Sequence, residues 1–353
     1  MSYESNSPII QHTISIHQVI QIVSGIEDRA QREALLTRAG ISPALLRSDL
    51  ARVTQRQFAR LMRLMVRGRR DELWGLCSQP VPLGTLATAC RFMATQPFLG
   101  QALRHGLRYY HALLPDFAPR LQVSNGVAYV RLSPRGSLKN PQHYGARAFV
   151  FLGYGVMCWL VARRIPVSEV VYQSSFKVPR SEASQLFQAP IRLENDDCGL
   201  RFDAKWLDLP IVQNSQSVEE FLKQVPECLL LRYRDQASST ERIRRVLRRY
   251  LSEEMPTLEE VSRMLATTPQ TLRRRLRREG YGYQQVKDAL RRDVAVEYLV
   301  RSELSLAEIA SKVGFSEAST FHRAFKAWTG LSPGAYRDAH QVPNPGVTFC
   351  HSD

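Results

Sequence analysis

The chain lacks the sequence features that mark several common classes of protein. Its six cysteines contain no C-x-x-C pair, and none stands at zinc-ligand spacing from a histidine, so a zinc finger or ribbon is not expected. Cysteines scattered in this way are typical of reduced thiols in a cytoplasmic protein rather than of a disulfide framework. The first ten residues have no positive region followed by an apolar core, so we expect no signal peptide.

Membrane spans and catalytic motifs are also missing. The longest apolar stretch, Ala146 to Ala162, contains Arg147 and two glycines and is followed by two arginines, which favours a buried helix over a membrane span. There is no G-x-S-x-G motif and no phosphate-cradling loop, and His105 and His111 are not at metal-ligand spacing on a helix. We therefore expect no membrane partner, no metal, no cofactor and no catalytic residue.

Acidic residues are scarce relative to basic ones. The 353 residues include 48 Lys and Arg against 33 Asp and Glu, a net charge of +15. A surplus of this size predicts a polyanionic partner, and nucleic acid remains once a membrane face is set aside. The alternative is a soluble basic protein without such a partner. Because the chain is too long for one ordinary core, two domains are expected.

The hydrophobic pattern changes its period along the chain. Apolar residues first recur at helical spacing and then alternate with polar residues around Asn125-Gly126, which is a strong signal for a hairpin. The expected elements are helices over 30–39, 55–66 and 99–114, a hairpin over 120–132, a helix over 144–163, a strand over 167–175, a short helix over 180–187 and a second hairpin over 191–202. Helices followed by hairpins predict an α+β domain.

Two segments near the C-terminus resemble each other, 256–279 and 304–327. Each opens with a short helix whose apolar residues lie three and four apart, followed by a tight turn and a second helix. We expect Thr268 and Ser316 to cap the second helices. Their buried stripes are Leu272 with Leu276 in the first copy and Phe321 with Phe325 in the second.

A short helix, a tight turn and a second helix with a polar outer face describe a helix-turn-helix unit. A helix just fits the major groove of B-DNA when one face is buried and basic side chains point outward. One unit alone could equally be a helical hairpin from a bundle, but two in tandem, joined by a helix over 284–300, predict DNA binding. Residues 238–338 hold 19 Lys and Arg and 13 Asp and Glu, only +6 of the total, so the prediction depends on arginines gathered on one face.

The second unit and its surroundings resemble AraC/XylS-type transcriptional regulators, over roughly the last hundred residues. The positions that carry this resemblance are Ile309-Ala310, Gly314-Phe315, Phe321, Arg323, Phe325-Lys326, Thr329-Gly330, Ser332-Pro333 and Tyr336-Arg337, with Leu290-Arg291-Arg292, Ala295 and Leu299 in the connecting helix. Ala266 departs from the pattern, because the first turn would favour glycine, and a left-handed alanine there costs roughly 1 kcal/mol.

The N-terminal part is similar to the arabinose-binding-like sensor domain of one AraC subgroup, over about residues 15 to 210. The matching positions are Ala39-Gly40-Ile41, Leu45-Leu46, Arg52-Val53, Phe58, Leu99-Gly100-Gln101-Ala102-Leu103, Val170-Val171-Tyr172-Gln173, Phe187 and Pro190-Ile191. These positions identify a fold better than a ligand.

The fold class expected from pattern and resemblance together is mainly α, with an α+β N-terminal domain and an all-α C-terminal domain that holds two helix-turn-helix units joined by a helix. The expected boundaries are a loose N-terminus over 1–14, a sensing and dimerisation domain over 15–210, a linker over 211–238, the DNA-binding domain over 239–340 and a tail over 341–353.

The resemblance implies which residues meet double-stranded DNA. Base edges would be read by Gln270, Arg273 and Arg274 in the first unit and by Ser319, His322 and Arg323, beside Ala318, in the second. Arg277, Arg278 and Lys326, a turn further along, would meet phosphates. For Arg275 and Arg323 an internal ion pair or a bracing role is the alternative.

The first domain is expected to sense a small-molecule effector, to form a homodimer, or both. The candidate effector-binding residues are Tyr109, Tyr110, His143, Tyr144 and Trp159, and the alternative is that they are ordinary core side chains. Arg67, Arg69 and Arg70 form a basic run that is either solvated surface or a contact for an acidic partner or anionic effector.

Three functions from different classes follow. The favoured one is a ligand-responsive, sequence-specific regulator that also meets RNA polymerase. The second is a ligand-independent regulator whose first domain only dimerises or binds protein. The third, an enzyme with a reactive cysteine fused to a DNA module, is disfavoured because Cys77, Cys90 and Cys158 have no adjacent base in the sequence. The effector, the target promoters and the sign of regulation stay open.

Overall fold

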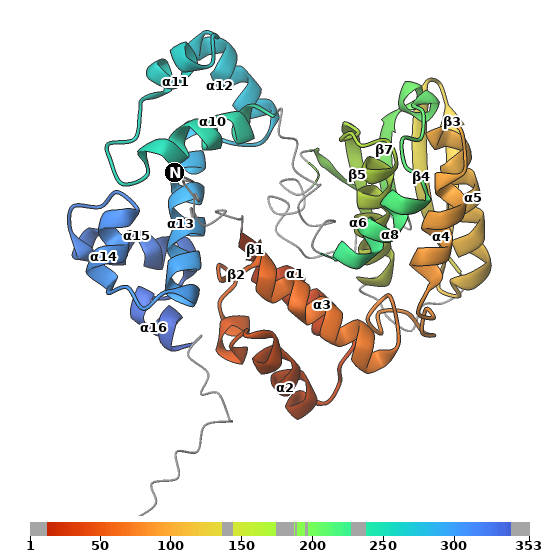
Figure 1. The fold of residues 1–353 in the computed structure, drawn as a ribbon, viewed down its shortest axis with the longest axis horizontal. Helices are drawn as coiled ribbons and strands as arrows, with labels where there is room; N and C mark the ends of the chain where they lie inside the picture. The colour runs from red at the N-terminus through yellow and green to blue at the C-terminus, as the bar shows by residue number, and fades with distance from the viewer. Residues whose placement is uncertain are drawn as a thin grey trace, which may run out of the picture.

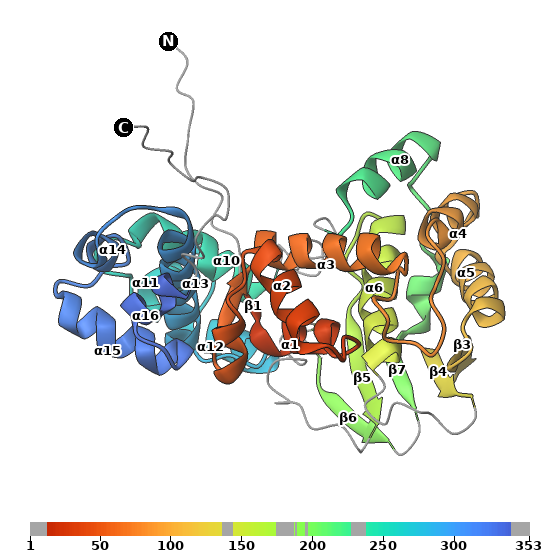
Figure 2. The same cartoon turned by 90° about the horizontal axis from the view of Figure 1, so that it is seen from below.

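The computed structural model describes residues 13–135, 144–173, 187, 189–194, 197–226 and 238–339, without the side chain of Arg278. It has three parts, which Figures 1 and 2 show from two directions: a helical N-terminal segment, an α/β part around a sheet, and a helical C-terminal domain. In both views the N-terminal helices lie between the other two parts.

The N-terminal segment is built from short helices and one small sheet. Its elements are β1 (Thr13–Ser15), α1 (Ile16–Val23), α2 (Arg29–Ala39), η1 (Pro43–Arg47), β2 (Arg52–Thr54) and α3 (Gln55–Arg69). Strand β1 pairs with β2 in antiparallel register. Helix α2 ends at Gly40, whose φ of +76° favours glycine, and Ser42 caps a 3-10 helix that begins with Pro43. The stop at residue 39 is as predicted.

The α/β part contains a five-stranded sheet of order β3-β4-β7-β5-β6. Its strands are β3 (Phe117–Ser124), β4 (Val127–Pro134), β5 (Val167–Gln173), β6 (Ile191–Glu194) and β7 (Cys198–Asp203). The first hairpin is confirmed, with Asn125 and Gly126 both at positive φ in its turn. The second hairpin, predicted over 191–202, is wrong. β5 lies between β6 and β7, parallel to β6 and antiparallel to β7. The alternating pattern over 191–202 therefore predicted the two strands but not which strands pair.

Helices cover this sheet and extend into the predicted linker. They are α4 (Thr85–Ala94), α5 (Leu99–Leu113), α6 (Tyr144–Leu160), η2 (Ala204–Asp208) and α8 (Ser215–Gln224). The ring of Phe221 in α8 stacks on Trp159 at 4.2 Å between centroids, and Arg91 pairs with Glu219 at 2.9 Å. Residues 215–224, placed in the linker by the sequence, therefore pack on the α/β part. Most of the predicted helix over 180–187 lies outside the described residues.

The C-terminal domain is arranged around one long helix. Its elements are α10 (Ser239–Leu247), η3 (Arg248–Tyr250), α11 (Leu258–Met264), α12 (Pro269–Arg278), α13 (Tyr283–Arg301), α14 (Leu306–Lys312), α15 (Ala318–Thr329) and α16 (Pro333–Asp338). In Figure 1, α10 to α12 lie at one end of α13 and α14 to α16 at the other. Within the described residues, no helix is both long and apolar enough to cross a membrane.

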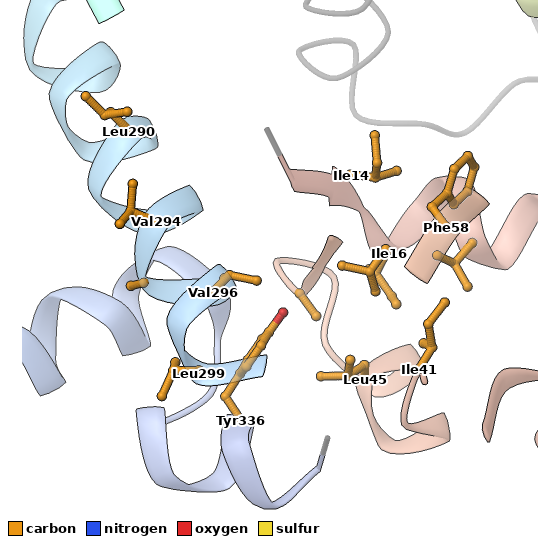
Figure 3. Close-up of a cluster of buried hydrophobic side chains, with 14 of the residues drawn as sticks. Ile14, Ile16, Ile41, Leu45, Phe58, Leu290, Val294, Val296, Leu299 and Tyr336 are labelled. Carbon is orange, nitrogen blue, oxygen red and sulfur yellow. The ribbon is translucent and has the colours of Figure 1, made fainter. Parts of the chain in front are cut away.

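The hydrophobic cores divide the chain differently from the predicted domains. One core joins the N-terminal segment to the C-terminal domain, and the other fills the α/β part. Figure 3 shows Ile14, Ile16 and Leu45 facing Val296 and Tyr336 across this contact. Residues 15–210 thus contribute to two cores, because the apolar stripes of the first helices find their partners on α13 and α16.

A buried polar cluster lies in the same contact. The carboxylate of Asp293 accepts a hydrogen bond from Arg244 Nη2 at 2.8 Å and another from the Thr13 hydroxyl. The Thr13 oxygen in turn accepts from Arg52 Nε at 2.6 Å. The side chains of Arg244 and Asp293 are 4% and 3% exposed. Burial, together with the nearby Arg52, lowers the pKa of Arg292 to about 10, so this guanidinium beside Asp293 remains charged at neutral pH.

We predict that Asp293→Ala destabilises the protein by about 3–5 kcal/mol, because it leaves buried guanidinium groups without their carboxylate. The measurement is the urea midpoint of the full chain. Asp288→Ala on the same helix is the control, because the one hydrogen bond that Asp288 accepts from the described residues is exposed and comes from Gln284. This change should cost about 0.5 kcal/mol or less. Equal losses in the two variants would contradict the role of Asp293.

Candidate DNA-binding interface and effector cavity

Both helices of the first helix-turn-helix unit are capped at their starts, the second at Thr268 as its sequence predicts. Thr257 and Glu260 form a capping box at the start of α11, in which the Glu260 carboxylate accepts the Thr257 N–H at 2.7 Å. Helix α12 begins after Thr268, whose hydroxyl oxygen accepts the Thr271 N–H, and Pro269 holds its first position. Both helix starts are therefore fixed by local bonds.

The two units have the same turn. Ala266 has a φ of +49° in the first unit, and Gly314, 48 residues later, has a φ of +78°. The next residue in each copy bonds back to the preceding helix, Thr267 N–H to Ser262 O and Phe315 N–H to Ala310 O. A Cβ on Gly314 would lie 2.6 Å from a backbone oxygen, so glycine is required there. The left-handed Ala266 bears the strain that its sequence implied.

The second unit differs from prediction at one cap. Ser305 and Glu308 form a capping box before α14. However, α15 starts after Glu317 and not after Ser316, and no side chain bonds to its first turn. The Ser319 hydroxyl donates to the Glu317 carboxylate at 3.1 Å instead. The predicted cap at Ser316 is wrong because the extra residue in this copy moves the start of the helix.

Both second helices bury the predicted stripes and expose the predicted polar faces. Leu272, Leu276, Phe321 and Phe325 are all buried. The proposed DNA contacts with described side chains are all exposed, namely Gln270, Arg273, Arg274, Arg277, Ser319, His322, Arg323 and Lys326. Arg278 belongs to α12, but its side chain lies outside the described part.

The arginines of α12 are available at its surface. Arg273 lies 3.8 Å from the Glu259 carboxylate, and both side chains are more than half exposed. An ion pair this exposed contributes about 0–1 kcal/mol, so a nucleic acid can replace it at little cost. Arg275, for which an internal pair was the alternative, is exposed too.

Helix α13 sets the separation of the two units. Its 19 residues form one unbroken helix, which at 1.5 Å per residue is about 28 Å long. Successive major-groove segments on one face of B-DNA are about 34 Å apart. The two units thus lie at opposite ends of a helix that is shorter than this repeat.

A cavity of about 380 Å³ lies where the N-terminal segment meets the α/β part. Its lining is mainly apolar and comes from α3, α4, α5, α6, α8, the strands β4 and β7, and the loop that follows α3. Figure 2 shows α3 extending from the other N-terminal helices toward α6. The volume is within the range of small-molecule sites, about 300–1,000 Å³.

Of the five residues predicted to bind an effector, only Tyr110 lines this cavity. Tyr109 packs edge-on against Phe92, and Tyr144 lies under the Arg147 guanidinium at 4.5 Å. Trp159 is buried against Phe221, as described above, and His143 lies outside the described residues. Tyr109, Tyr144 and Trp159 are thus packing residues outside the cavity.

The sequence interpretation missed most of the lining. Trp74 was not considered, because it lies in an irregular loop without a periodic signal. Arg67 was noted as part of a basic run, with an anionic effector as one of its alternatives, and it does line the cavity. Gly153 was noted only as a break in an apolar helix, although small residues in such a helix can also mark open space beside it.

Comparison with known proteins decides the family. The arabinose-binding domain of AraC transcription regulators (N-term) matches residues 30–211, and a helix-turn-helix domain matches residues 261–339. The chain belongs to the AraC family. It is 30% identical over 243 residues to the ornithine utilization regulator of Pseudomonas aeruginosa, which covers 68% of this chain and 71% of that one.

Other AraC relatives match more narrowly. The regulator VirS of Mycobacterium tuberculosis is 29% identical over 147 residues, 42% of this chain and 43% of VirS. The crystal structure of CdpR from Pseudomonas aeruginosa covers 75% of this chain and 89% of CdpR, with 22% identity and a TM-score of 0.32.

This AraC-family protein is therefore a DNA-binding transcription regulator with an N-terminal domain of the ligand-binding type. Its relatives are regulators and not enzymes. Among the residues that the structure describes, no group of three or more His, Cys, Asp and Glu could hold a metal ion.

We predict that Ala266→Gly stabilises the protein by about 1 kcal/mol, because glycine adopts positive φ without strain. The readout is the urea midpoint of the full chain. The control is Ala34→Gly in the middle of α2, an exposed position in right-handed helix, where the same change should cost about 1 kcal/mol. A loss of stability in both variants would contradict the strain at residue 266.

Proposed function

We propose that this AraC-family regulator reads DNA with α12 and α15, and that a small molecule bound in the cavity controls it. The single observation that carries the DNA part is the repeated unit, with a buried stripe and an exposed polar face in each copy. In this proposal Gln270, Arg273 and Arg274 in the first unit, and Ser319, His322 and Arg323 in the second, contact bases. Arg277, Arg278 and Lys326 contact phosphates.

Arg273→Ala should weaken binding to the cognate site about 10- to 100-fold, because an arginine that pairs with guanine contributes roughly 1–3 kcal/mol of discrimination. Binding to unrelated DNA should fall far less. Fluorescence anisotropy on cognate and scrambled duplexes at one salt concentration measures both. Arg104→Ala, an exposed change of equal charge on α5, is the control. An equal loss on the two duplexes would make Arg273 a phosphate contact and remove it from base reading.

The route from the cavity to the DNA-binding domain runs through α3 and the segment before it. Met62 and Val66 of α3 line the cavity, and Met62 also belongs to the core shared with the C-terminal domain. Arg52, three residues before α3 begins, accepts a hydrogen bond on its carbonyl oxygen from the Tyr336 hydroxyl. A displacement of α3 by a ligand would therefore also displace α16.

The second recognition helix also contacts this segment. The Ser48 hydroxyl donates to the carbonyl oxygen of Thr329 at 2.9 Å, at the C-terminal end of α15. The residues proposed to read bases lie at the opposite end of the same helix. A ligand that binds the two arrangements of α3 with different affinity would shift the position of α15, and so the affinity for DNA.

We extend the proposal to a cytoplasmic homodimer, because two copies would occupy adjacent half-sites. The dimer would also contact RNA polymerase, because a regulator acts on transcription through the polymerase. The alternative is a regulator whose N-terminal domain serves only dimerisation or protein contacts. A variant in which the cavity is blocked distinguishes this alternative from the favoured function.

Gly153 offers a way to block it. Gly153 lines the cavity, and a Cβ built on it meets nothing within 4 Å. Gly153→Leu should fill the space and also favour helix α6, so its melting temperature should be no lower than that of the natural chain. In the host cell, the ratio of transcript levels between growth conditions, at the promoters that the protein occupies, should be smaller in this variant by about fivefold or more. This is the scale of allosteric couplings.

Two measurements accompany this comparison. Genome-wide mapping of occupied sites defines the promoters, and DNA binding by the purified variant should equal that of the natural chain without effector. Unchanged responses in cells, from a Gly153→Leu protein that folds and binds DNA normally, would support the ligand-independent regulator.

A further inference from the structure

The inner wall of the cavity would accept an apolar body. Leu107, Phe149, Val150 and Met157 line it, with further aliphatic side chains from α5 and α6. An aromatic or aliphatic group can replace the water at such a wall favourably, at about 25 cal/mol for each Å² of apolar surface removed from water. The wall by itself does not distinguish a neutral ligand from a charged one.

Positive charge gathers where the cavity opens to solvent. Arg63 and Arg67 are one turn apart on α3, and Lys223 is in the last turn of α8. All three line the cavity and are exposed. Among the described residues, neither Arg67 nor Lys223 has an ion-pair partner. Two cations that face the same opening would attract an anion and repel a cation.

The lining also holds hydrogen-bond donors without acceptors. Trp74 is 3% exposed, and within the described part of the chain its indole N–H has no partner. The loop that carries it is fixed, because the Asp71 carboxylate accepts the backbone N–H groups of Leu73, Gly75 and Val81. A buried N–H left unpaired costs about 1–3 kcal/mol. Because this nitrogen is closed off from solvent, a ligand oxygen would reach it only after a shift of the indole ring.

Tyr154 and Tyr110, which both line the cavity, differ in whether their hydroxyl groups have a hydrogen-bond partner. The Tyr154 hydroxyl donates to the carbonyl oxygen of Ile165 at 2.7 Å. The Tyr110 hydroxyl has no hydrogen-bond partner among the described residues. Tyr110 therefore adds a second donor that a ligand could use.

The one acidic residue of the lining is already occupied. The two carboxylate oxygens of Glu72 accept the backbone N–H groups of Gly84 and Leu86, each at 2.7 Å. Burial raises the pKa of Glu72, and these two backbone hydrogen bonds act in the opposite direction. It is therefore a poor partner for a ligand ammonium group.

We propose that the ligand of this cavity is an apolar molecule with a single oxyanion, of which a carboxylate is the simplest, held by Arg67, Lys223 and the free donors of the lining. This inference rests on the proposed function, because it names the chemical class of the effector. It predicts poor binding for cations and for compounds without an apolar body.

The test uses the full chain and a series of probes that share one body: 5-phenylpentanoate, 5-phenylpentan-1-ol and 5-phenylpentan-1-amine, with L-ornithine as a fourth probe. Isothermal titration measures each dissociation constant. We expect the carboxylate to bind about tenfold tighter than the alcohol, since charge-assisted hydrogen bonds are worth more than neutral ones. The amine and ornithine should bind more weakly than the alcohol.

Three variants locate the binding. Arg67→Gln with Lys223→Gln should reduce the affinity for the carboxylate about tenfold and leave that for the alcohol unchanged. Gly153→Leu should abolish binding of both probes, whereas Gly334→Leu should not, because Gly334 is in α16 and likewise has open space around it.

Other outcomes overturn the assignment in distinguishable ways. Equal affinity for carboxylate and alcohol, or tighter binding of the amine or ornithine, would reject the oxyanion while leaving the cavity as an effector site. Carboxylate binding that survives Gly153→Leu, or is absent from the natural chain, would reject the proposed ligand class. The response of Gly153→Leu in cells tests effector control separately.

Discussion

Asp293 and the residues that bond to it hold together parts of the chain that are far apart in sequence. Thr13, 280 residues earlier, donates to this carboxylate, and Arg244 completes the pair. Because both charges are buried, they are tolerated only when each satisfies the other. The apolar contact in Figure 3 joins the same two parts of the chain, so the position of the DNA-binding domain depends on the first elements of the N-terminal segment.

Because of this arrangement, α3 contacts both the core shared with the C-terminal domain and the cavity. Phe58, near its start, packs in the core shared with α13 and α16, and Val66, two turns later, lines the cavity. In the proposed regulation, a ligand in the cavity would displace the element that the cavity lining shares with this core. In this fold that element is a single helix with its start fixed by the Thr54 capping box.

Features set by neighbours in sequence could be predicted, and features set by distant contacts could not. The caps at Thr268 and Gly40 and the stripes of α12 and α15 follow from spacing within a few residues. The place of β6 beside β5, and the packing of β1 and β2 on α13, depend on partners that no local pattern specifies. The cavity belongs to this second group, because its lining is assembled from five helices, two strands and the irregular loop that carries Trp74.

The continuity of α13 has a consequence for the DNA itself. Because no break interrupts its 19 residues, α13 is a continuous connection between the two units that are proposed to read DNA. An extra base pair between the two segments of an operator would turn one segment by about 34° relative to the other, given 10 to 10.5 base pairs per turn. In the proposed mode of reading DNA, the length between the two operator segments, and not only their sequence, would affect binding.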